Sequence, residues 1–393
     1  MLRSREEHER KKGYNMNIRK INGTYAEAVV FLTDAPETAM DDYSVAQIKM
    51  ICDNEAAKDS RIRIMPDCHP GKIGPVGLTM TVGRRILPGL VGIDIGCGVT
   101  MGKIKTKKME FQKLDSVIRD KIPSGFSLRK NPHHYMEDFD LSRLHCYENI
   151  RKEKAALSLG TLGGGNHFIE VDKDGDGNHY LAIHSGSRHL GKEVAEYYLA
   201  KGQEKIKQRG IQVPYEMTWL EGTLMDRYLK DVQVVQEFAA LNRKTMLDIL
   251  CKEMKWKLQE FFSCIHNYVE KGKEGCILRK GAVSAREGEP VVIPINMRDG
   301  IILGRGLGNP EWNCSSPHGA GRTLKRTEVS ASYTVSAFKK EMKGIYSSCI
   351  SKETLDESPF AYRGMEIQEA VRETVQEEAL LKPLYNYKAG SNR

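Results

Sequence analysis

Several features that would each indicate a particular class of protein are missing from this sequence. No apolar run approaches the ~18 residues that a membrane-spanning helix needs, so we expect no membrane partner. No CxxC pair occurs among the nine cysteines, which excludes a zinc ribbon or a thioredoxin-type motif. The charged start, MLRSREEHERKKGY, has no apolar stretch behind it and is not a secretory signal. We therefore expect a cytoplasmic location and reduced cysteines.

The composition is that of an ordinary globular protein. Hydrophobic residues make up 40% and charged residues 28% of the 393 positions, which excludes a wholly disordered or fibrous chain. Sixty Lys and Arg residues face fifty-two Asp and Glu residues, a formal net charge of +8. Such an excess favours anionic partners, among them nucleotides and nucleic acids.

Glycine is unevenly distributed, and this divides the chain. Residues 71–102 and 160–191 are rich in glycine and strand-like runs, whereas residues 193–271 show the three-to-four-residue apolar spacing of helices. We predict one α+β domain over residues 16–393, with a helical insertion at about 190–265 and a charged, frayed extension at residues 1–15. The insertion is expected to hold helices over 192–208 and 224–265. A last helix is expected at about 368–381, before a strand-like tail at 384–388.

Histidine is scarce, with eleven in the chain, and six of these end an apolar or Gly-rich stretch. The six are His69, His167, His184, His189, His266 and His318. A single histidine in such a position is more often a hydrogen-bonded core residue than a ligand. Their recurrence in one sequence context indicates a site built from several segments.

The block LVGIDIGCGVTMG supplies two further ligand types. Asp94 ends a strand-like run, and Cys97 follows among glycines that let the backbone bend tightly. Taken alone, the pair is equally consistent with a turn cap and a buried thiol. Together with His167, His184 and His266, it gives one oxygen, one sulfur and three nitrogens. That set suffices for two ions of zinc, manganese or iron if the thiolate bridges them.

Other segments have features of phosphate-binding sites. The consecutive glycines of GTLGGGNH could direct backbone N–H groups at an anion. SPHGAGRTLKR is typical of a turn that enters a helix, with Arg322 in the first helical turn. HSGSR, LNRK and LRKG each place a basic residue beside small or polar ones, and each alone would be an ordinary solvated turn. The residues together predict a metal-dependent enzyme that acts on phosphates.

These motifs also occur together in a known order: DCHPGKIGPVG, VGIDIGCGV, GTLGGGNHFIE, HSGSRHLG, AALNRKTM, HNYV, RKGAVSAR, RGLGN and HGAGR. In this they resemble the RtcB family of RNA ligases, over roughly residues 65–388. The resemblance implies a single α+β domain of mixed and antiparallel sheets around a central metal and nucleotide cleft. It also implies GTP- and Mn²⁺-dependent joining of RNA 3′-phosphate or 2′,3′-cyclic phosphate ends to 5′-hydroxyl ends, in tRNA splicing or RNA repair.

The resemblance further implies a role for each of several positions. His318 corresponds to the histidine that attacks GTP and carries GMP, and Arg188 and Arg322 correspond to basic positions that handle phosphate. The ligands of a two-manganese site, with the sulfur shared, correspond to Asp94, Cys97, His167, His184 and His266. The guanylate contacts correspond to Asn166, Glu170, Tyr362 and Lys388.

The sequence departs from the family pattern at two places, which leaves alternatives open. Residues 294–298, PINMR, stand where the family has a PGSMG-type loop, and Pro317 precedes His318 where a small polar residue is usual. A damage-specific RNA-repair paralogue is one alternative. A metal-dependent phosphoesterase that acts on RNA ends without sealing them is another, and it would need the metal ligands but not His318. An RNA-binding repair partner without catalysis is disfavoured by the intact ligand set.

Overall fold

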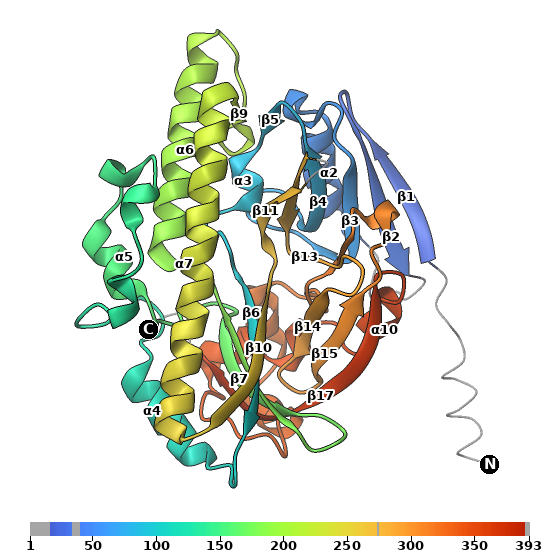
Figure 1. Cartoon of the computed structure of the whole chain (residues 1–393). Helices are drawn as coiled ribbons and strands as arrows, with labels where there is room; N and C mark the ends of the chain where they lie inside the picture. Colours follow the sequence, from blue (N-terminus) through green and yellow to red (C-terminus); the bar gives the residue numbers. More distant parts are fainter. Residues whose placement is uncertain (1–15, 34–39, 273–274, 390–393) are drawn as a thin grey trace, which may run out of the picture.

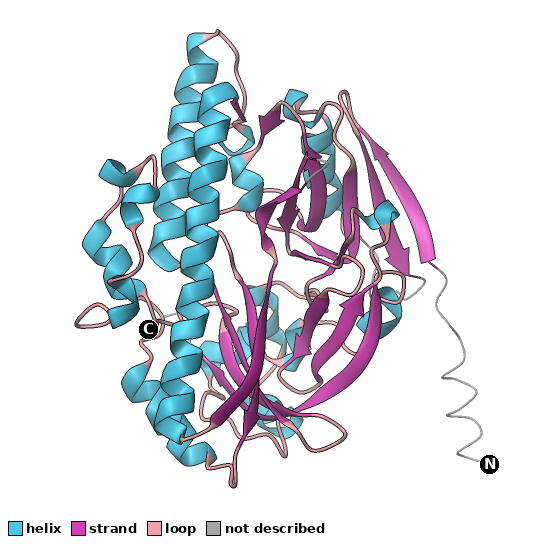
Figure 2. Cartoon of the chain, in the orientation of Figure 1, coloured by secondary structure: helices cyan, strands magenta, loops and turns pink. Residues whose placement is uncertain are grey.

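Two sheets and a bank of helices make up the part of the chain that the computed structural model describes, residues 16–33, 40–272 and 275–389. Helices cover one side, and the strands gather on the other (Figures 1 and 2). The α+β class predicted from the sequence is confirmed. The predicted extension at residues 1–15 lies outside the described residues, and the domain bounds stay a prediction. Among the described residues, no helix has the length and apolarity that crossing a membrane requires.

The first sheet has six strands, and only its β2–β3 pair is parallel. In spatial order they are β1 (Met16–Asn22), β2 (Glu27–Thr33), β3 (Ile62–His69), β4 (Val76–Val82), β12 (Gly275–Lys280) and β11 (Asn267–Gly272). A short ladder of β13 (Ala282–Ser284) with β16 (Ser315–Pro317) lies close by, and a second pairs β5 (Arg85–Ile86) with β9 (Leu220–Glu221).

The second sheet has seven strands, all antiparallel to their neighbours. In spatial order they are β10 (Lys257–Ile265), β6 (Gly98–Lys105), β8 (His179–Ser185), β7 (Phe168–Lys173), β17 (Val375–Lys388), β15 (Gly300–Gly306) and β14 (Pro290–Asn296). Segments far apart in the sequence therefore become neighbours in β10, β6, β8 and β7.

Two long helices lie side by side along both sheets (Figure 1). They are α6 (Arg188–Gln208) and α7 (Gly222–Met254), and α7 contacts β11 of the first sheet and β6 and β8 of the second. The shorter helices are α2 (Asp42–Cys52), α3 (Pro88–Val91), α4 (Phe111–Lys121), α5 (Lys152–Ser158), α8 (Arg326–Ser332), α9 (Val335–Glu341) and α10 (Ile367–Ala370).

The two faces of the second sheet have different partners because side chains alternate along a strand. In β8, Leu181 and Ile183 pack against α4 and α7 in one apolar cluster. Ala182 belongs to a separate cluster on the opposite face, and His184 points the same way as Ala182. This opposite face, turned away from the long helices, carries the candidate site.

Two helix predictions were wrong at their ends. The helix expected over 224–265 ends at Met254, where Lys255 adopts a left-handed φ of 54°, and Lys257–Ile265 forms β10. The helix expected at about 368–381 is only the single turn α10, and Val375–Lys388 forms one long strand. In both places a distant partner strand, β6 or β15, supplies hydrogen bonds that override the local helical pattern.

Candidate active site

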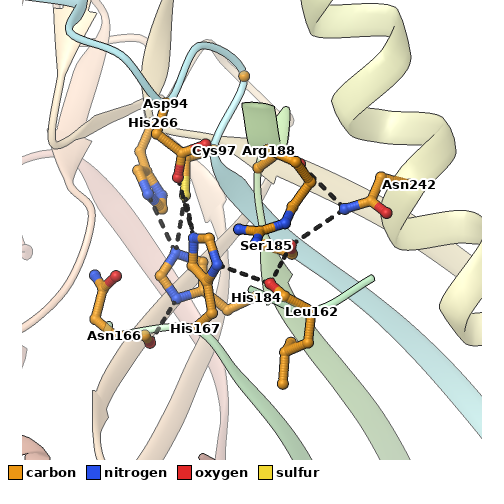
Figure 3. A network of polar contacts seen from close by, with 12 residues as sticks. Asp94, Cys97, Leu162, Asn166, His167, His184, Ser185, Arg188, Asn242 and His266 are labelled. Atoms are coloured by element: carbon orange, nitrogen blue, oxygen red, sulfur yellow. Dashed lines mark hydrogen bonds and ion pairs between the residues drawn. The ribbon is translucent and has the colours of Figure 1, made fainter. Parts of the chain in front are cut away.

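Strand ends of the second sheet bring together the five predicted metal ligands. Asp94 and Cys97 lie in the turn between α3 and β6, His184 is in β8, and His167 immediately precedes β7. His266 links β10 to β11. Because β10, β6, β8 and β7 are adjacent, these side chains converge at one point (Figure 3).

The ligand atoms are close enough to share cations. The Cys97 sulfur lies 3.4 Å from Nε2 of His167 and 3.4 Å from Nε2 of His184. Beyond these, Oδ2 of Asp94 lies 3.0 Å from Nε2 of His167, and Nε2 of His266 lies 3.4 Å from Nε2 of His184. The sulfur thus stands between an Asp94–His167 pair and a His184–His266 pair (Figure 3).

Backbone carbonyls determine which ring nitrogen faces the centre. Nδ1 of His167 lies 2.8 Å from the Leu162 carbonyl, and Nδ1 of His184 lies 3.1 Å from the Asn166 carbonyl. Since a carbonyl oxygen only accepts, each Nδ1 donates its proton to a carbonyl, and Nε2 is the ring nitrogen that faces the centre. Burial and neighbouring histidines lower the pKa of His184 and of His266 well below the ordinary value, so these rings stay neutral. Converging nitrogen lone pairs of this kind fit a metal site.

The thiol of Cys97 fits the same interpretation. Burial, together with the neighbouring Asp94 carboxylate, raises the pKa of Cys97 well above its ordinary value. A thiolate at this position therefore needs a cation beside it, which is the usual state of a coordinating cysteine. Within the described residues, the ligand atoms of Cys97, His167 and His184 all lie within 4.8 Å of one another. The donor set of oxygen, sulfur and nitrogen fits manganese, zinc or iron.

Helix α7 supports the loops behind this centre. Nη1 of Arg243, a fully buried residue, donates to the carbonyls of Gly96 at 2.8 Å and Ser185 at 2.9 Å. Asn242 donates from Nδ2 to the Gly186 carbonyl at 3.1 Å. The interpretation of LNRK as a phosphate-binding segment was wrong for these two residues. They hold the backbone on either side of the metal ligands.

Arg279 of the LRKG segment also proved to be internal rather than a phosphate contact. Its guanidinium has no exposed surface and donates to Glu270 at 2.6 Å and to Ser315 at 2.8 Å. Two of the six histidines are neither predicted ligands nor the predicted nucleophile. His189 pairs with Glu193 one turn along α6 at 2.8 Å. His69 lines the cavity described below, with Nδ1 3.0 Å from the Asp67 carbonyl oxygen.

Arg188 opens α6 and turns its guanidinium towards the loop that precedes His167. Nη2 donates to the Gly125 carbonyl at 2.9 Å, and Nε donates to Thr161 Oγ1 at 3.3 Å. Gly163 is required here, because it has a φ of 85° and a Cβ on it would lie 1.7 Å from Nη1 of Arg188. The first of the three consecutive glycines therefore makes room for a basic side chain near the metal ligands.

His318 follows β16 directly and faces His266, with 4.8 Å between the ring centroids. Its Nδ1 lies 2.9 Å from Oδ2 of Asp67, a carboxylate with no exposed surface. A carboxylate only accepts, so the pairing places the proton on Nδ1 and leaves the lone pair on Nε2. The sequence analysis missed Asp67, although it stands in DCHPGK, the first of the Gly-rich histidine segments. Pro317 ends β16 and leaves this pairing intact.

A cavity of about 240 Å³ opens beside His184, His266 and His318. All four predicted guanylate contacts line it: Asn166, Glu170, Tyr362 and Lys388. Residues 294–297, part of the segment that departs from the family pattern, form one wall. There Oδ1 of Asn296 accepts from the backbone N–H groups of Arg298 and Asp299, at 3.0 Å each, and so closes a turn.

Glu357, which the sequence analysis also missed, connects the cations behind this cavity. The carboxylate is 2% exposed and lies 3.3 Å from Arg322 Nη1 and 3.3 Å from Lys388 Nζ. It also pairs with Arg326 and accepts a hydrogen bond from the Tyr362 hydroxyl. Burial opposes ionisation, yet these cations lower the pKa of Glu357 to about 2.

The place of Arg322 differs from the prediction. Helix α8 begins only at Arg326, so Arg322 lies in the connecting loop and not in a first helical turn. Its guanidinium lies over the Tyr362 ring, 4.9 Å from the centroid, and lines the cavity. Arg322 therefore lies beside Tyr362, a predicted guanylate contact, but extends from a loop and not from a helix.

Comparison with known proteins agrees with the geometry. The model of the family described as tRNA-splicing ligase RtcB matches residues 54–144 and 133–389. The RNA-splicing ligase RtcB1 of Escherichia coli is 31% identical in an alignment that covers 78% of this chain and 84% of that protein. The tRNA-splicing ligase RtcB of Nanoarchaeum equitans is 28% identical in an alignment that covers 79% of this chain and 83% of that protein. The chain therefore belongs to the RtcB family.

Proposed function

We propose that this chain is a GTP- and Mn²⁺-dependent RNA ligase, which joins RNA 3′-phosphate or 2′,3′-cyclic phosphate ends to 5′-hydroxyl ends through a histidine–GMP intermediate. Family relatives named RNA-splicing and tRNA-splicing ligases support the ligase class. One observation carries the mechanism. His318, with Nδ1 bonded to buried Asp67, stands between the cluster of metal-ligand side chains and the cavity.

The nucleophile in this proposal is Nε2 of His318. Asp67 holds the proton on Nδ1, so the lone pair of Nε2 is available to attack the α-phosphorus of GTP. A bond forms between Nε2 and that phosphorus, and the bond to pyrophosphate breaks. Manganese ions held by Asp94, Cys97, His167, His184 and His266 would withdraw charge from the phosphates when bound.

The cavity would hold the guanylate during this step. Asn166, Glu170, Tyr362 and Lys388 line it and offer hydrogen-bonding groups, an aromatic face and a cation. Arg322 lies on the same wall, and Arg188 approaches the centre from the other side, so phosphate groups would be held between two guanidinium groups.

Sealing would follow in two transfers. The RNA 3′-phosphate first takes GMP from His318, which breaks the phosphorus–nitrogen bond and leaves an RNA end activated by GMP. The 5′-hydroxyl of the second RNA then displaces GMP and forms the phosphodiester. The net charge of +8 suits a substrate that is gripped through its phosphate backbone. We place this activity in cytoplasmic tRNA splicing or RNA repair.

Incubation with α-labelled GTP and Mn²⁺ tests the proposal. We expect an acid-labile protein–GMP adduct that peptide mapping assigns to His318, and sealing of a 3′-phosphate RNA to a 5′-hydroxyl RNA. The alternative, a phosphoesterase, would open 2′,3′-cyclic phosphates with no adduct and no sealed product. The Asp67–His318 pair favours the ligase, since hydrolysis at the metals has no need of an oriented histidine nucleophile.

A further inference from the structure

A second buried carboxyl group stands behind Glu170. Asp172 lies two positions further along β7, so its side chain points to the same face of the sheet. Glu170 is 3% exposed and Asp172 has no exposed surface. Apart from the neighbouring Glu170 carboxyl group, neither carboxyl oxygen of Asp172 has a hydrogen-bond partner among the described residues. A buried carboxylate without a partner is strongly disfavoured, so this group is expected to keep its proton.

Among the groups near Asp172, Glu170 is the one that can accept a hydrogen bond from its carboxyl proton. Asn386 on β17 stands opposite Glu170 and donates from Nδ2 to Oε2 of Glu170. Tyr180 on β8 stands opposite Asp172, but its hydroxyl bonds to Asp174 at 3.2 Å. The other charged and titratable groups that line the cavity are Lys388, Arg322, Arg326, Tyr362, His69, His184, His266 and His318.

The pKa shifts of the two carboxyl groups agree with a protonated Asp172 that donates to Glu170. Burial, together with repulsion from Glu170, raises the pKa of Asp172 well above its ordinary value. Burial also raises the pKa of Glu170, but hydrogen bonds from Asp172 and Asn386 and the charge of Lys388 limit that rise to about 7. Asp172 therefore acts as the donor, and Glu170 is the member of the pair that ionises.

We propose that Asp172 is a positioning residue for base selection, because its carboxyl proton keeps Glu170 an ionised acceptor aimed into the cavity. The cavity, which Glu170 and Asn386 line, then presents the ionised carboxylate of Glu170 to the base. The two adjacent oxygens of a carboxylate match the neighbouring N1–H and N2–H groups of guanine. Adenine would place a lone pair there, and a site built to receive N–H donors rejects such an analogue. This inference rests on the proposed use of GTP.

Two variants of similar size separate a donated proton from simple packing. Asp172→Asn keeps an N–H donor for Glu170, whereas Asp172→Leu removes it. The readout is the equilibrium binding of GMP and of AMP, measured by titration calorimetry from pH 5.5 to 8.5. We expect the wild type and Asp172→Asn to prefer GMP by at least about tenfold at pH 8. At the same pH, Asp172→Leu should lose most of that preference, because GMP binding weakens while AMP binding does not.

The pH dependence provides the second readout. In the wild type, GMP binding should weaken as the pH falls through about 7, where Glu170 takes up a proton. Without a donor from position 172 the pKa of Glu170 rises, so this loss should begin at a higher pH in Asp172→Leu. Asp172→Asn should keep the wild-type profile. A packing role alone would lower affinity for both nucleotides without moving the profile.

Each contrary result has a distinct meaning. An unchanged GMP preference and pH profile in Asp172→Leu would overturn the inference. A pH profile of Asp172→Asn that is shifted to higher pH would also overturn it. This second measurement is still possible if Asp172→Leu does not fold. A wild-type protein that binds GMP no better than AMP, yet is labelled by neither GTP nor ATP, would contradict the proposed function itself.

Discussion

The cluster of metal-ligand side chains and the nucleotide cavity are neighbours that are held together in different ways. In the cluster, backbone carbonyls orient His167 and His184, and Arg243 of α7 fixes the loops from behind. In the cavity wall, side-chain charges hold one another, with Glu357 binding Arg322 and Lys388. A backbone-held cluster should fail completely when one ligand is lost. The cavity wall should lose function only in part when one of its charged residues is replaced. Its cations can exchange one anionic partner for another, as they would when an anionic nucleotide enters.

The largest effect is expected from Cys97→Ala. The sulfur contacts His167 of one pair and His184 of the other, and no other described thiol lies within the group of ligand atoms, so metal content and ligation should both be lost. Metal analysis by mass spectrometry, with a sealing assay, measures this. Cys68→Ala is the matched control, because Cys68 is equally buried but is not part of the cluster. Equal metal loss in both variants would refute the shared thiolate.

Asp67→Asn tests the link between the two regions. The substitution removes the charge that holds the proton on Nδ1 of His318 but leaves the metal ligands untouched. We expect adduct formation from GTP to slow by about 10²- to 10⁴-fold, the usual contribution of an oriented proton-handling group. Single-turnover labelling with α-labelled GTP gives this rate. A wild-type rate in this variant, at normal metal content, would show that the pairing does not serve the chemistry.

Glu357→Gln should have a smaller, graded effect that depends on pH. The folded pKa of Glu357 is lowered to about 2 from an ordinary 4.5, so its carboxylate contributes stability above about pH 4.5 that is lost as the pH falls towards 2. At pH 7 the variant should be less stable by about 3 kcal/mol, since several buried cations lose their partner. Denaturant unfolding at pH 7 and pH 3 measures both values. The gap between wild type and variant should narrow at pH 3, and a constant gap would contradict this account.

The sequence predicted the cluster better than it predicted the cavity wall, and the reason is physical. Asp94, Cys97, His167 and His184 each stand in a Gly-rich segment, and His266 ends an apolar one. Asp67 acts only through His318, 251 positions away, and Glu357 lies in an ordinary charged run. Glu357 has no local signal, and the DCHPGK segment around Asp67 does not indicate its partner, because the role of each residue depends on side chains that only the fold brings near.

Secondary structure shows the same limit. The long apolar periodicity correctly predicted α6 and most of α7, whose contacts lie along one helix face. It failed over residues 257–265 and 375–381, which form strands because they hydrogen-bond to strands elsewhere in the chain. The strand predicted at 384–388 is confirmed as the end of β17. Basic motifs were misread for a related reason. Arg243 and Arg279 resemble phosphate contacts in the sequence but are buried and bonded within the protein.

His318→Ala offers the most direct test of the proposal that the histidine beside the metal ligands is the nucleophile. The variant should retain its metals, form no GMP adduct and fail to seal RNA from GTP. It should still seal an RNA whose 3′-phosphate already carries GMP, because that step follows transfer from the histidine. An adduct of normal yield in His318→Ala would contradict the covalent mechanism for this protein.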